Sequence, residues 1–562
     1  MTEEKNPPQD ADKKEESPKP NKALEPSVLK GEIKIFPDKR LPHLDQGIIK
    51  AYQATGVGGI KAFAMVCEKH IIPQAEIVHK YTGITCPHLP KLLACGVVDW
   101  ALDMKEHFVF VYEDKLGNPI ALNKNALAMG LKGDVVVSTV LRNLLDALSA
   151  MHDNAFVHGN IRVDNLFDGG STTFENASLG ETLSVPAGYA QPVIYETISR
   201  ALATPLGRGM PDYADDIYAL GVTISSLMRV HNPAEGLSDE EIINQKVELG
   251  SFNFLTGKDR FPAQILEFLR GTLNDDPQLR WTFADIMVWA DGRRVSAKQG
   301  GALTALKASR PLEFSRRKFL RPQALSMVLP QDSSIVVPLV ENGELFLWLN
   351  RSLQDKEYET RYEQALTEAQ KASGNSNYAD RLASAMAIAM APENPIFYRS
   401  LKFTPTGFGS LLIEAMQTKK DLTPFVDMIQ GSLVGFWSKC TQIHADGVGD
   451  AVNRIENCQR FLSQAMIGYG IERCVYYLCP MAPCLSEKLS GFYVRSAEDY
   501  LMALEKMSGS KQRPEWFLDR HIVAFLSVRD KSIIEPFLAD IAASERHRQR
   551  LGVLKVFASI QK

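Results

Sequence analysis

Residues 151–167 read Met-His-Asp-Asn-Ala-Phe-Val-His-Gly-Asn-Ile-Arg-Val-Asp-Asn-Leu-Phe, and they decide how the rest of the chain is interpreted. Directly before them, between Val137 and Met151, apolar residues recur at helical spacing, and Asp134 is the predicted N-cap. The pattern predicts a long amphipathic helix that ends near His152, followed by a polar loop.

Three further segments follow this loop along the chain. Ser178-Leu-Gly180 comes thirteen residues after Asn165. Asp216-Ile-Tyr-Ala-Leu-Gly221 opens a second stretch of helical periodicity that runs to Met228, and Asp276-Pro-Gln-Leu-Arg280-Trp-Thr282 comes last. The order and spacing of the segments are more informative than any one of them alone.

In this order the segments resemble the landmarks of the protein-kinase-like superfamily. The loop from His158 to Asn165 is similar to the pattern H-R-D-L-K-x-x-N, and residues 178–180 stand where D-F-G would. The last two segments resemble D-x-[WY]-x-x-G and D-P-x-x-R-x-T. The resemblance covers roughly residues 31–291 and implies structural roles for five residues: His158, Gly180, Asp216, Gly221 and Arg280.

The resemblance also implies two contacts. Asp216 would hold the backbone of the catalytic loop. Arg280 would pair with the glutamate that ends the activation segment, for which Glu196 is the candidate.

The catalytic positions of this pattern carry the wrong side chains. Asn160 occupies the position of the base, and a carboxamide cannot accept a proton at neutral pH. Ser178 replaces the metal-binding aspartate, and a neutral hydroxyl is a poor ligand for Mg²⁺. Asn165, the second metal position, is retained, and Arg162 keeps the positive charge of the usual lysine.

The lysine that holds the phosphates is also missing from its expected place. The strand Phe63-Ala-Met-Val66 resembles V-A-I-K and puts Val66 at the lysine position. Lys61 and Lys69 flank this strand as possible substitutes, and Glu76 is the candidate helix partner of such a lysine. The glycines of 56–59 do not form G-x-G-x-x-G and predict a hairpin turn.

These losses make the chain similar to a serine/threonine-kinase-like pseudokinase. No metal site is predicted, although Glu181 remains an alternative metal ligand. No cofactor is certain. ATP, bound with weak or no dependence on Mg²⁺, stays open because Asn165 alone does not decide it.

Composition excludes several other classes of protein. The 562 residues are 45% hydrophobic and 23% charged, with a net charge of -4, which is typical of a soluble globular protein and argues against nucleic-acid binding. No apolar run is long enough to span a membrane. Eight cysteines are too few for a disulfide scaffold, and the N-terminus lacks a signal-peptide core, so a cytoplasmic location is expected.

The expected fold class is α+β, with a bilobal protein-kinase-like fold followed by an all-α C-terminal region. The predicted boundaries are a disordered charged and Pro-rich tail at 1–30, an N-lobe at 31–115, a C-lobe at 116–291, a linker at 292–311 and a helical domain at 312–562. Predicted helices of the last region include 355–371 and an amphipathic segment at 533–541.

The leading functional hypothesis is a pseudokinase that acts as a cytoplasmic scaffold or regulatory binding protein, with a protein partner and without efficient phosphoryl transfer. Two alternatives stay open. One is a divergent, active serine/threonine kinase that uses Lys61 or Lys69 and Glu181. The other is a helical interaction protein whose kinase-like part is an appendage. The sequence leaves the partner and the oligomeric state unknown.

Overall fold

The structure is a computed structural model that describes residues 24–122, 130–229, 231–298, 306–441, 447–509 and 516–561. Most of the predicted N-terminal tail (1–23) and part of the predicted linker (299–305) lie outside the described residues. The disordered tail was predicted to reach residue 30. Its last part is wrong, because Ser27–Leu29 forms strand β1, which pairs with β2 and buries Ser27 and Leu29.

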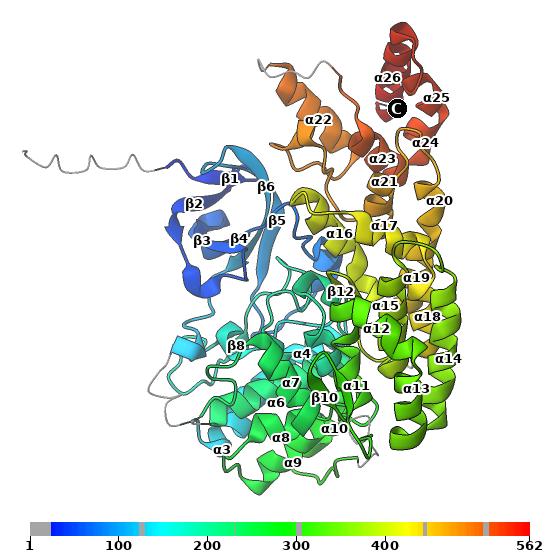
Figure 1. The fold of residues 1–562 in the computed structure, drawn as a ribbon. Helices are drawn as coiled ribbons and strands as arrows, with labels where there is room; N and C mark the ends of the chain where they lie inside the picture. Colours follow the sequence, from blue (N-terminus) through cyan, green and yellow to red (C-terminus); the bar gives the residue numbers. More distant parts are fainter. Residues whose placement is uncertain are drawn as a thin grey trace, which may run out of the picture.

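A six-stranded antiparallel sheet forms the N-terminal part of the chain (Figure 1). Its strands are β1 (Ser27–Leu29), β2 (Ile33–Arg40), β3 (Lys50–Thr55), β4 (Lys61–Val66), β5 (Leu92–Trp100) and β6 (Lys105–Glu113), in the spatial order β1-β2-β3-β4-β6-β5. The hairpin turn predicted at 56–59 is confirmed between β3 and β4, where Gly58 and Gly59 have positive φ.

The sheet curls so that its two edges meet. The Ser27 hydroxyl donates to the Asp99 carbonyl at 2.8 Å and accepts from the Ala101 N–H at 3.2 Å. Side chains alternate along each strand, so one face encloses a small apolar cluster that includes Tyr52 and Trp100, and the other face joins the main core of the molecule.

Helices dominate from residue 133 to residue 290. They are α3 (Gly133–Val135), a π-helical segment (Val136–Leu141), α4 (Arg142–His152), α5 (Ile198–Ala201), α6 (Tyr213–Met228), α7 (Asp239–Leu249), α8 (Ser251–Thr256), α9 (Ala263–Thr272) and α10 (Phe283–Ala290). Both helices predicted from periodicity, before His152 and up to Met228, are confirmed. Asp134 is not the N-cap, because the helix already begins at Gly133 and Lys132 takes that position.

The remaining part of the chain is mostly, but not entirely, helical. Its helices are α11 (Pro322–Ser326), α12 (Ser333–Glu341), α13 (Glu344–Trp348), α14 (Lys356–Gln370), α15 (Tyr378–Met390), α16 (Phe408–Gln417), α17 (Thr423–Gln430), α18 (Leu433–Cys440), α19 (Val448–Asn457), α20 (Gln459–Leu462), α21 (Ile471–Leu478), α22 (Ala497–Ser508), α23 (Arg520–Arg529), α24 (Lys531–Ile534), α25 (Leu538–Ile541) and α26 (Arg546–Ile560). The helix predicted at 355–371 is confirmed as α14. The segment predicted as one helix at 533–541 is broken by Pro536 into α24, a 3-10 turn and α25.

The expectation of an all-α C-terminal region is wrong in one respect. Two short hairpins occur there, β9 (Leu312–Phe314) with β10 (Arg317–Phe319), and β11 (Ile396–Tyr398) with β12 (Leu401–Phe403). The first turns through Ser315 and Arg316, both with positive φ, without the glycine or asparagine that normally marks such a turn.

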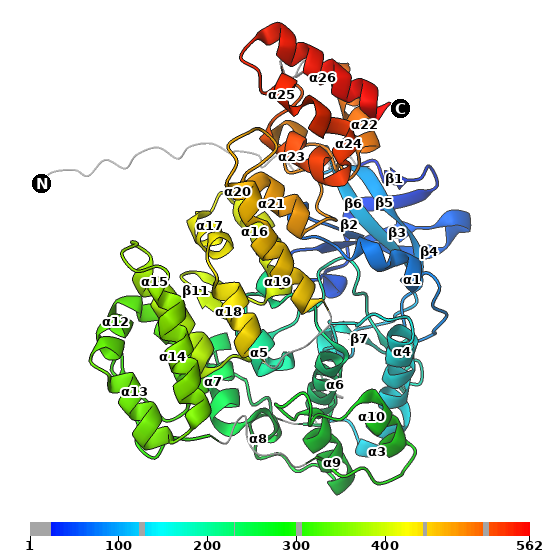
Figure 2. The same ribbon diagram turned by 90° about the vertical axis from the view of Figure 1, so that its right-hand side faces the viewer.

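The C-terminal helices run beside both the sheet and helices α3–α10 (Figures 1 and 2). At the sheet, the Glu106 N–H donates to the Gly491 carbonyl at 2.9 Å. Near α5, the Thr404 N–H donates to the Gly207 carbonyl at 2.8 Å. Among the described residues, no helix combines the length and apolar character needed to cross a bilayer.

Candidate active site

The loop after α4 is held in place by Asp216, which lies in the first turn of α6 and is 1% exposed. One carboxylate oxygen accepts from the His158 N–H and the other from the Gly159 N–H, both at 2.8 Å. Gly159 has a φ of 61°, and a Cβ there would lie 2.6 Å from the Ala187 Cβ. Asp216 therefore fixes the loop backbone, as the resemblance implies for this aspartate.

His158 is fully buried behind the loop. Its Nε2 lies 3.2 Å from the Gly180 carbonyl, and its Nδ1 accepts from the Asn160 N–H at 3.2 Å. Burial lowers the pKa of His158 to about 4, although Asp216 opposes this shift. The imidazole is thus neutral near pH 7, with its proton on Nε2, and it serves as a fixed support of the loop.

The predicted base position, Asn160, lies inside a closed network of polar side chains. Its Nδ2 donates to Oε1 of Gln46 at 2.9 Å, and its Oδ1 accepts from Nη1 of Arg162. Arg162 also donates from Nη2 to the same Gln46 oxygen at 2.8 Å. Both Asn160 and Arg162 are buried, so neither side chain is presented to a substrate hydroxyl.

Gln46 was not predicted from the sequence, yet it occupies the centre of the site. It belongs to the connection between β2 and β3, and it is 2% exposed. Its Nε2 donates to Oδ1 of Asn165 at 2.9 Å, while its Oε1 binds Asn160 and Arg162. A hydrogen bond fixes this connection to β3, since Oδ1 of Asp45 accepts from the Ala51 N–H at 2.9 Å.

The two predicted metal positions do not present metal ligands. Both polar atoms of the Asn165 amide already have hydrogen-bond partners. Its Oδ1 accepts from Nε2 of Gln46, and its Nδ2 donates to the Asn160 carbonyl, both at 2.9 Å. Ser178 is buried in β8 (Ser178–Leu179), which pairs with β7 (Leu166–Phe167). Gly180 leaves room for Asn165, since a Cβ at Gly180 would lie 2.0 Å from the Asn165 oxygen.

Glu181, the alternative metal ligand, accepts hydrogen bonds from Tyr112 and Ser184. Its carboxylate accepts from the Tyr112 hydroxyl at 3.1 Å, from the Ser184 hydroxyl at 2.5 Å and from the Ser184 N–H at 3.1 Å. Burial raises the pKa of this carboxyl, and the three hydrogen bonds oppose the shift. Among the described residues, no three His, Cys, Asp or Glu side chains are grouped as a metal site would need.

Val66 itself does not face the site, and in the part of the chain that the structure describes no lysine hydrogen-bonds to Asn160, Asn165 or Ser178. The Val66 side chain lies in the small apolar cluster with Tyr52 and Trp100, on the opposite face of the sheet from Cys67. Cys67 faces the segment after Gly180 instead, with its Sγ 3.6 Å from the Ser184 carbonyl. The strand therefore directs position 66 away from Asn160.

The predicted substitutes for this lysine have other partners. Lys61 is largely exposed and pairs with Asp114 at 2.8 Å. Lys69 donates to the carbonyls of Leu489 and Phe492, at 2.9 Å and 3.0 Å, and burial lowers its pKa to about 8. Lys69 thus binds the C-terminal part of the chain.

The predicted helix partner Glu76 is exposed. The neighbouring Gln74 points inward and donates to the Thr182 carbonyl at 2.8 Å. A short helical turn, α1 (Val78–Tyr81), follows.

Arg280 and Gly221 support α6, but the predicted pair of Arg280 with Glu196 is wrong. Arg280 donates to the Asn274 and Ala214 carbonyls, at 2.9 Å and 2.8 Å. Glu196 pairs instead with Arg200 at 2.8 Å and with Arg208 at 3.5 Å. A Cβ at Gly221 would lie 2.4 Å from the Thr272 hydroxyl oxygen, so this position needs glycine.

The residues present do not fit Mg²⁺ and ATP in the manner that the resemblance implies. A bound triphosphate needs a cation and carboxylate-held Mg²⁺, whereas this loop offers amides that are already hydrogen-bonded to Gln46. The arrangement can hold two parts of the chain together, and no phosphoryl-transfer step follows from it.

Comparison with known proteins supports a kinase-like superfamily. No protein-family model matches the chain. Serine/threonine-protein kinase SSK22 of Saccharomyces cerevisiae is 27% identical over 188 residues, which cover 28% of this chain and 13% of that protein. Calcium/calmodulin-dependent protein kinase type 1 of Caenorhabditis briggsae is 24% identical over 251 residues, covering 42% of this chain and 65% of the relative.

A calcium/calmodulin-dependent protein kinase of Metarhizium anisopliae is 23% identical over 294 residues, covering 48% of this chain and 70% of that protein. The chain is therefore similar to protein kinases, and it spans less than two thirds of the length of the first two relatives.

Proposed function

We propose that the chain is a pseudokinase, which acts as a cytoplasmic scaffold or regulatory binding protein without efficient phosphoryl transfer. Residues 31–115 and 116–291 would form the two lobes of a kinase-like fold. Residues 292–311 would connect them to a mostly helical region at 312–562. A protein partner would bind this assembly.

The observation that carries the proposal is the position of Gln46. In a kinase-like arrangement, the space between the first strands and the catalytic loop has to admit the phosphates. Here the buried Gln46 of the β2–β3 connection hydrogen-bonds to three residues of the loop, Asn160, Arg162 and Asn165. A buried amide with all of these partners is costly to remove, because each lost bond would leave a buried polar group unpaired.

Contacts of the C-terminal half support the scaffold role. Lys69 binds carbonyls of the 489–492 segment, and Lys506 of α22 pairs with Glu106 of β6 at 2.6 Å. The 402–406 segment contacts the turn after α5, where the Thr204 N–H donates to the Lys402 carbonyl at 3.0 Å. The C-terminal half thus contacts both proposed lobes and would keep them at a fixed separation.

The second candidate is an active, divergent serine/threonine kinase, which the names of the similar proteins favour. It would require Gln46 to withdraw and a carboxylate to reach the metal position. Glu181 would then have to leave Tyr112 and Ser184.

The test compares full-length wild type with Gln46→Ala and Asn165→Ala. The assays are thermal stability with and without MgATP, and transfer of labelled γ-phosphate to the chain itself and to generic protein substrates. We expect no transfer by any of the three proteins, and no rise of the melting temperature of wild type with MgATP. Transfer by wild type or by Gln46→Ala that Asn165→Ala abolishes would overturn the proposal.

A further inference from the structure

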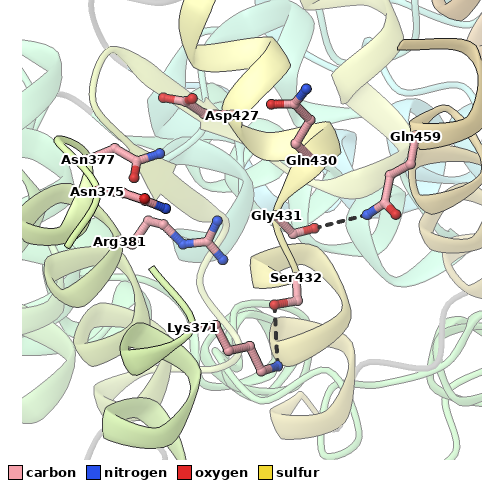
Figure 3. A pocket seen from close by; sticks show the side chains of 9 residues that line it. All are labelled: Lys371, Asn375, Asn377, Arg381, Asp427, Gln430, Gly431, Ser432 and Gln459. Atoms are coloured by element: carbon pink, nitrogen blue, oxygen red, sulfur yellow. Dashed lines mark hydrogen bonds between the residues drawn. The ribbon is translucent and has the colours of Figure 1, made fainter. Parts of the chain in front are cut away.

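A cavity of about 350 Å³ lies in the helical C-terminal half (Figure 3). Its walls come from the turn between α14 and α15, the turn between α17 and α18, and the start of α20. The lining residues that matter most are polar: Lys371, Asn377, Arg381, Gln430, Ser432 and Gln459. The volume is within the range of small-molecule sites, at its lower end.

Two helices begin at the wall of this cavity. Asn377 is the N-cap of the 13-residue helix α15, and Ser432 is the N-cap of the 8-residue helix α18. Neither N-cap side chain accepts a hydrogen bond from its helix. The N–H groups of the first turn of α18 therefore keep the partial positive charge that favours an anion. The first turn of α15 carries Asp380, and its Tyr378 N–H donates to the Asn375 carbonyl at 3.1 Å.

Arg381 is the second, independent observation. It is 8% exposed, its Nε has no hydrogen-bond partner among the described residues, and its Nη2 lies 3.6 Å from a Glu368 oxygen. Figure 3 shows the guanidinium pointing into the space beside Gly431 and Ser432. A Cβ at Gly431 would lie 2.5 Å from Nη1 of Arg381, so the glycine leaves room for this group.

Lys371 and Arg381 share one carboxylate at this wall of the cavity. The Glu368 carboxylate accepts from both Lys371 and Ser432, so one anion serves two cations, Lys371 and Arg381. Asp427 also lines the cavity, and its Oδ2 is bound by the Tyr398 hydroxyl at 2.9 Å and by Nη1 of Arg399 at 3.1 Å. Arg399 also pairs with Asp380 at 2.7 Å.

The other lining groups suit hydroxyl groups of a ligand. Asn377 lines the wall with its side-chain amide. The amides of Gln430 and Gln459 also line the wall, and the latter donates to the Gly431 carbonyl at 3.5 Å. Amides can both donate to and accept from a hydroxyl.

We propose that this cavity binds a small, hydroxyl-bearing phosphate ester. Its phosphate would lie between Lys371, Arg381 and the N-terminus of α18, since planar guanidinium and ammonium groups both bind phosphate strongly. Its hydroxyl groups would bind Asn377, Gln430 and Gln459. The site is separate from Asn160 and Asn165, and it does not depend on the function proposed above.

The test measures binding of glucose phosphate, inorganic phosphate, glucose and citrate to the full chain, by calorimetry and by shift of the melting temperature. The variants are Lys371→Gln, Arg381→Gln and Gly431→Ala. Lys439→Gln is the matched control, because Lys439 is exposed on α18 outside the cavity. Lys371→Gln is informative even if the buried variants do not fold, because the Lys371 side chain is 55% exposed.

We expect glucose phosphate to bind wild type and Lys439→Gln equally, and to bind Lys371→Gln at least about tenfold more weakly. Inorganic phosphate should bind more weakly than the ester, and glucose should not bind. The proposal is overturned if no phosphate compound binds at millimolar concentration, or if the cavity variants bind as wild type does. Equal affinity for inorganic phosphate, or tighter binding of citrate, would overturn the assignment to a phosphate ester.

Discussion

Two buried arginines with similar exposure have opposite surroundings. Arg162 in the loop after α4 is 6% exposed and donates to Asn160 and Gln46, whereas Arg381 at the cavity is 8% exposed and has an Nε without a partner. The polar groups around Arg162 are hydrogen-bonded to one another, so they offer few free donors or acceptors to a ligand. Those around Arg381 are left with unused donors. Burial alone therefore does not identify a binding site, and the unused hydrogen-bonding capacity distinguishes the two regions.

The largest effect is expected from breaking the loop region at its anchor. Asp216→Ala would leave the buried N–H groups of His158 and Gly159 without their acceptor. We expect the free energy of unfolding to fall by about 3–5 kcal/mol, measured by urea denaturation.

Asp146→Ala is the control for this experiment, because Asp146 is an exposed residue of α4. We expect it to change stability by less than about 0.5 kcal/mol. Similar losses in the two variants would mean that Asp216 does not anchor the loop.

Acid should lower the free energy of unfolding through His158, which lies in the same region. The pKa of His158 is about 4 in the fold against an ordinary 6.5, so below pH 6.5 the unfolded chain binds a proton that the folded chain does not. The free energy of unfolding should therefore decrease as the pH falls from 6.5 toward 4, by about 2 kcal/mol between pH 7 and pH 5.

The measurement is urea denaturation of wild type and His158→Gln at both pH values. The glutamine variant lacks this titration, so the difference between the two pH dependences isolates His158 from other groups. Parallel pH dependences would show that His158 is not held neutral.

Much of the fold could be predicted because its determinants are local. Apolar periodicity predicted the helix before His152 and the one ending at Met228, and the apolar, β-rich run that includes 63–66 predicted a strand. The hairpin at Ser315 and Arg316 escaped prediction because neither residue type marks a turn with positive φ.

The candidate site could be predicted only in part. The resemblance located the loop and the Asp216 anchor, because both lie in segments with a recognisable pattern. Gln46 escaped because it lies 114 residues from Asn160 in a loop with no pattern of its own, and only tertiary packing brings the two amides together. The same limit applies to Val66, whose direction depends on which face of the sheet meets the loop.

Removing Gln46 should open the closed region at moderate cost. In Gln46→Ala, the buried amides of Asn160 and Asn165 and the Arg162 guanidinium each lose a partner. We expect stability to fall by about 2 kcal/mol, less than for Asp216→Ala because water can enter the vacated space. Hydrogen exchange should show faster exchange in the loop of residues 158–165. Unchanged stability would mean that the network does not hold β2, β3 and the loop together.

The smallest effect on stability is expected at the cavity beside Arg381. Lys371 has a half-exposed side chain, and Glu368 keeps Ser432 and Arg381 when the lysine charge is removed. Lys371→Gln should therefore change the unfolding free energy without ligand by less than about 0.5 kcal/mol, measured by urea denaturation. With glucose phosphate present, wild type should gain stability and the variant should not, because only the native state binds the ligand. A large loss of stability without ligand would place Lys371 with Arg162, among side chains whose main role is to hold the fold together.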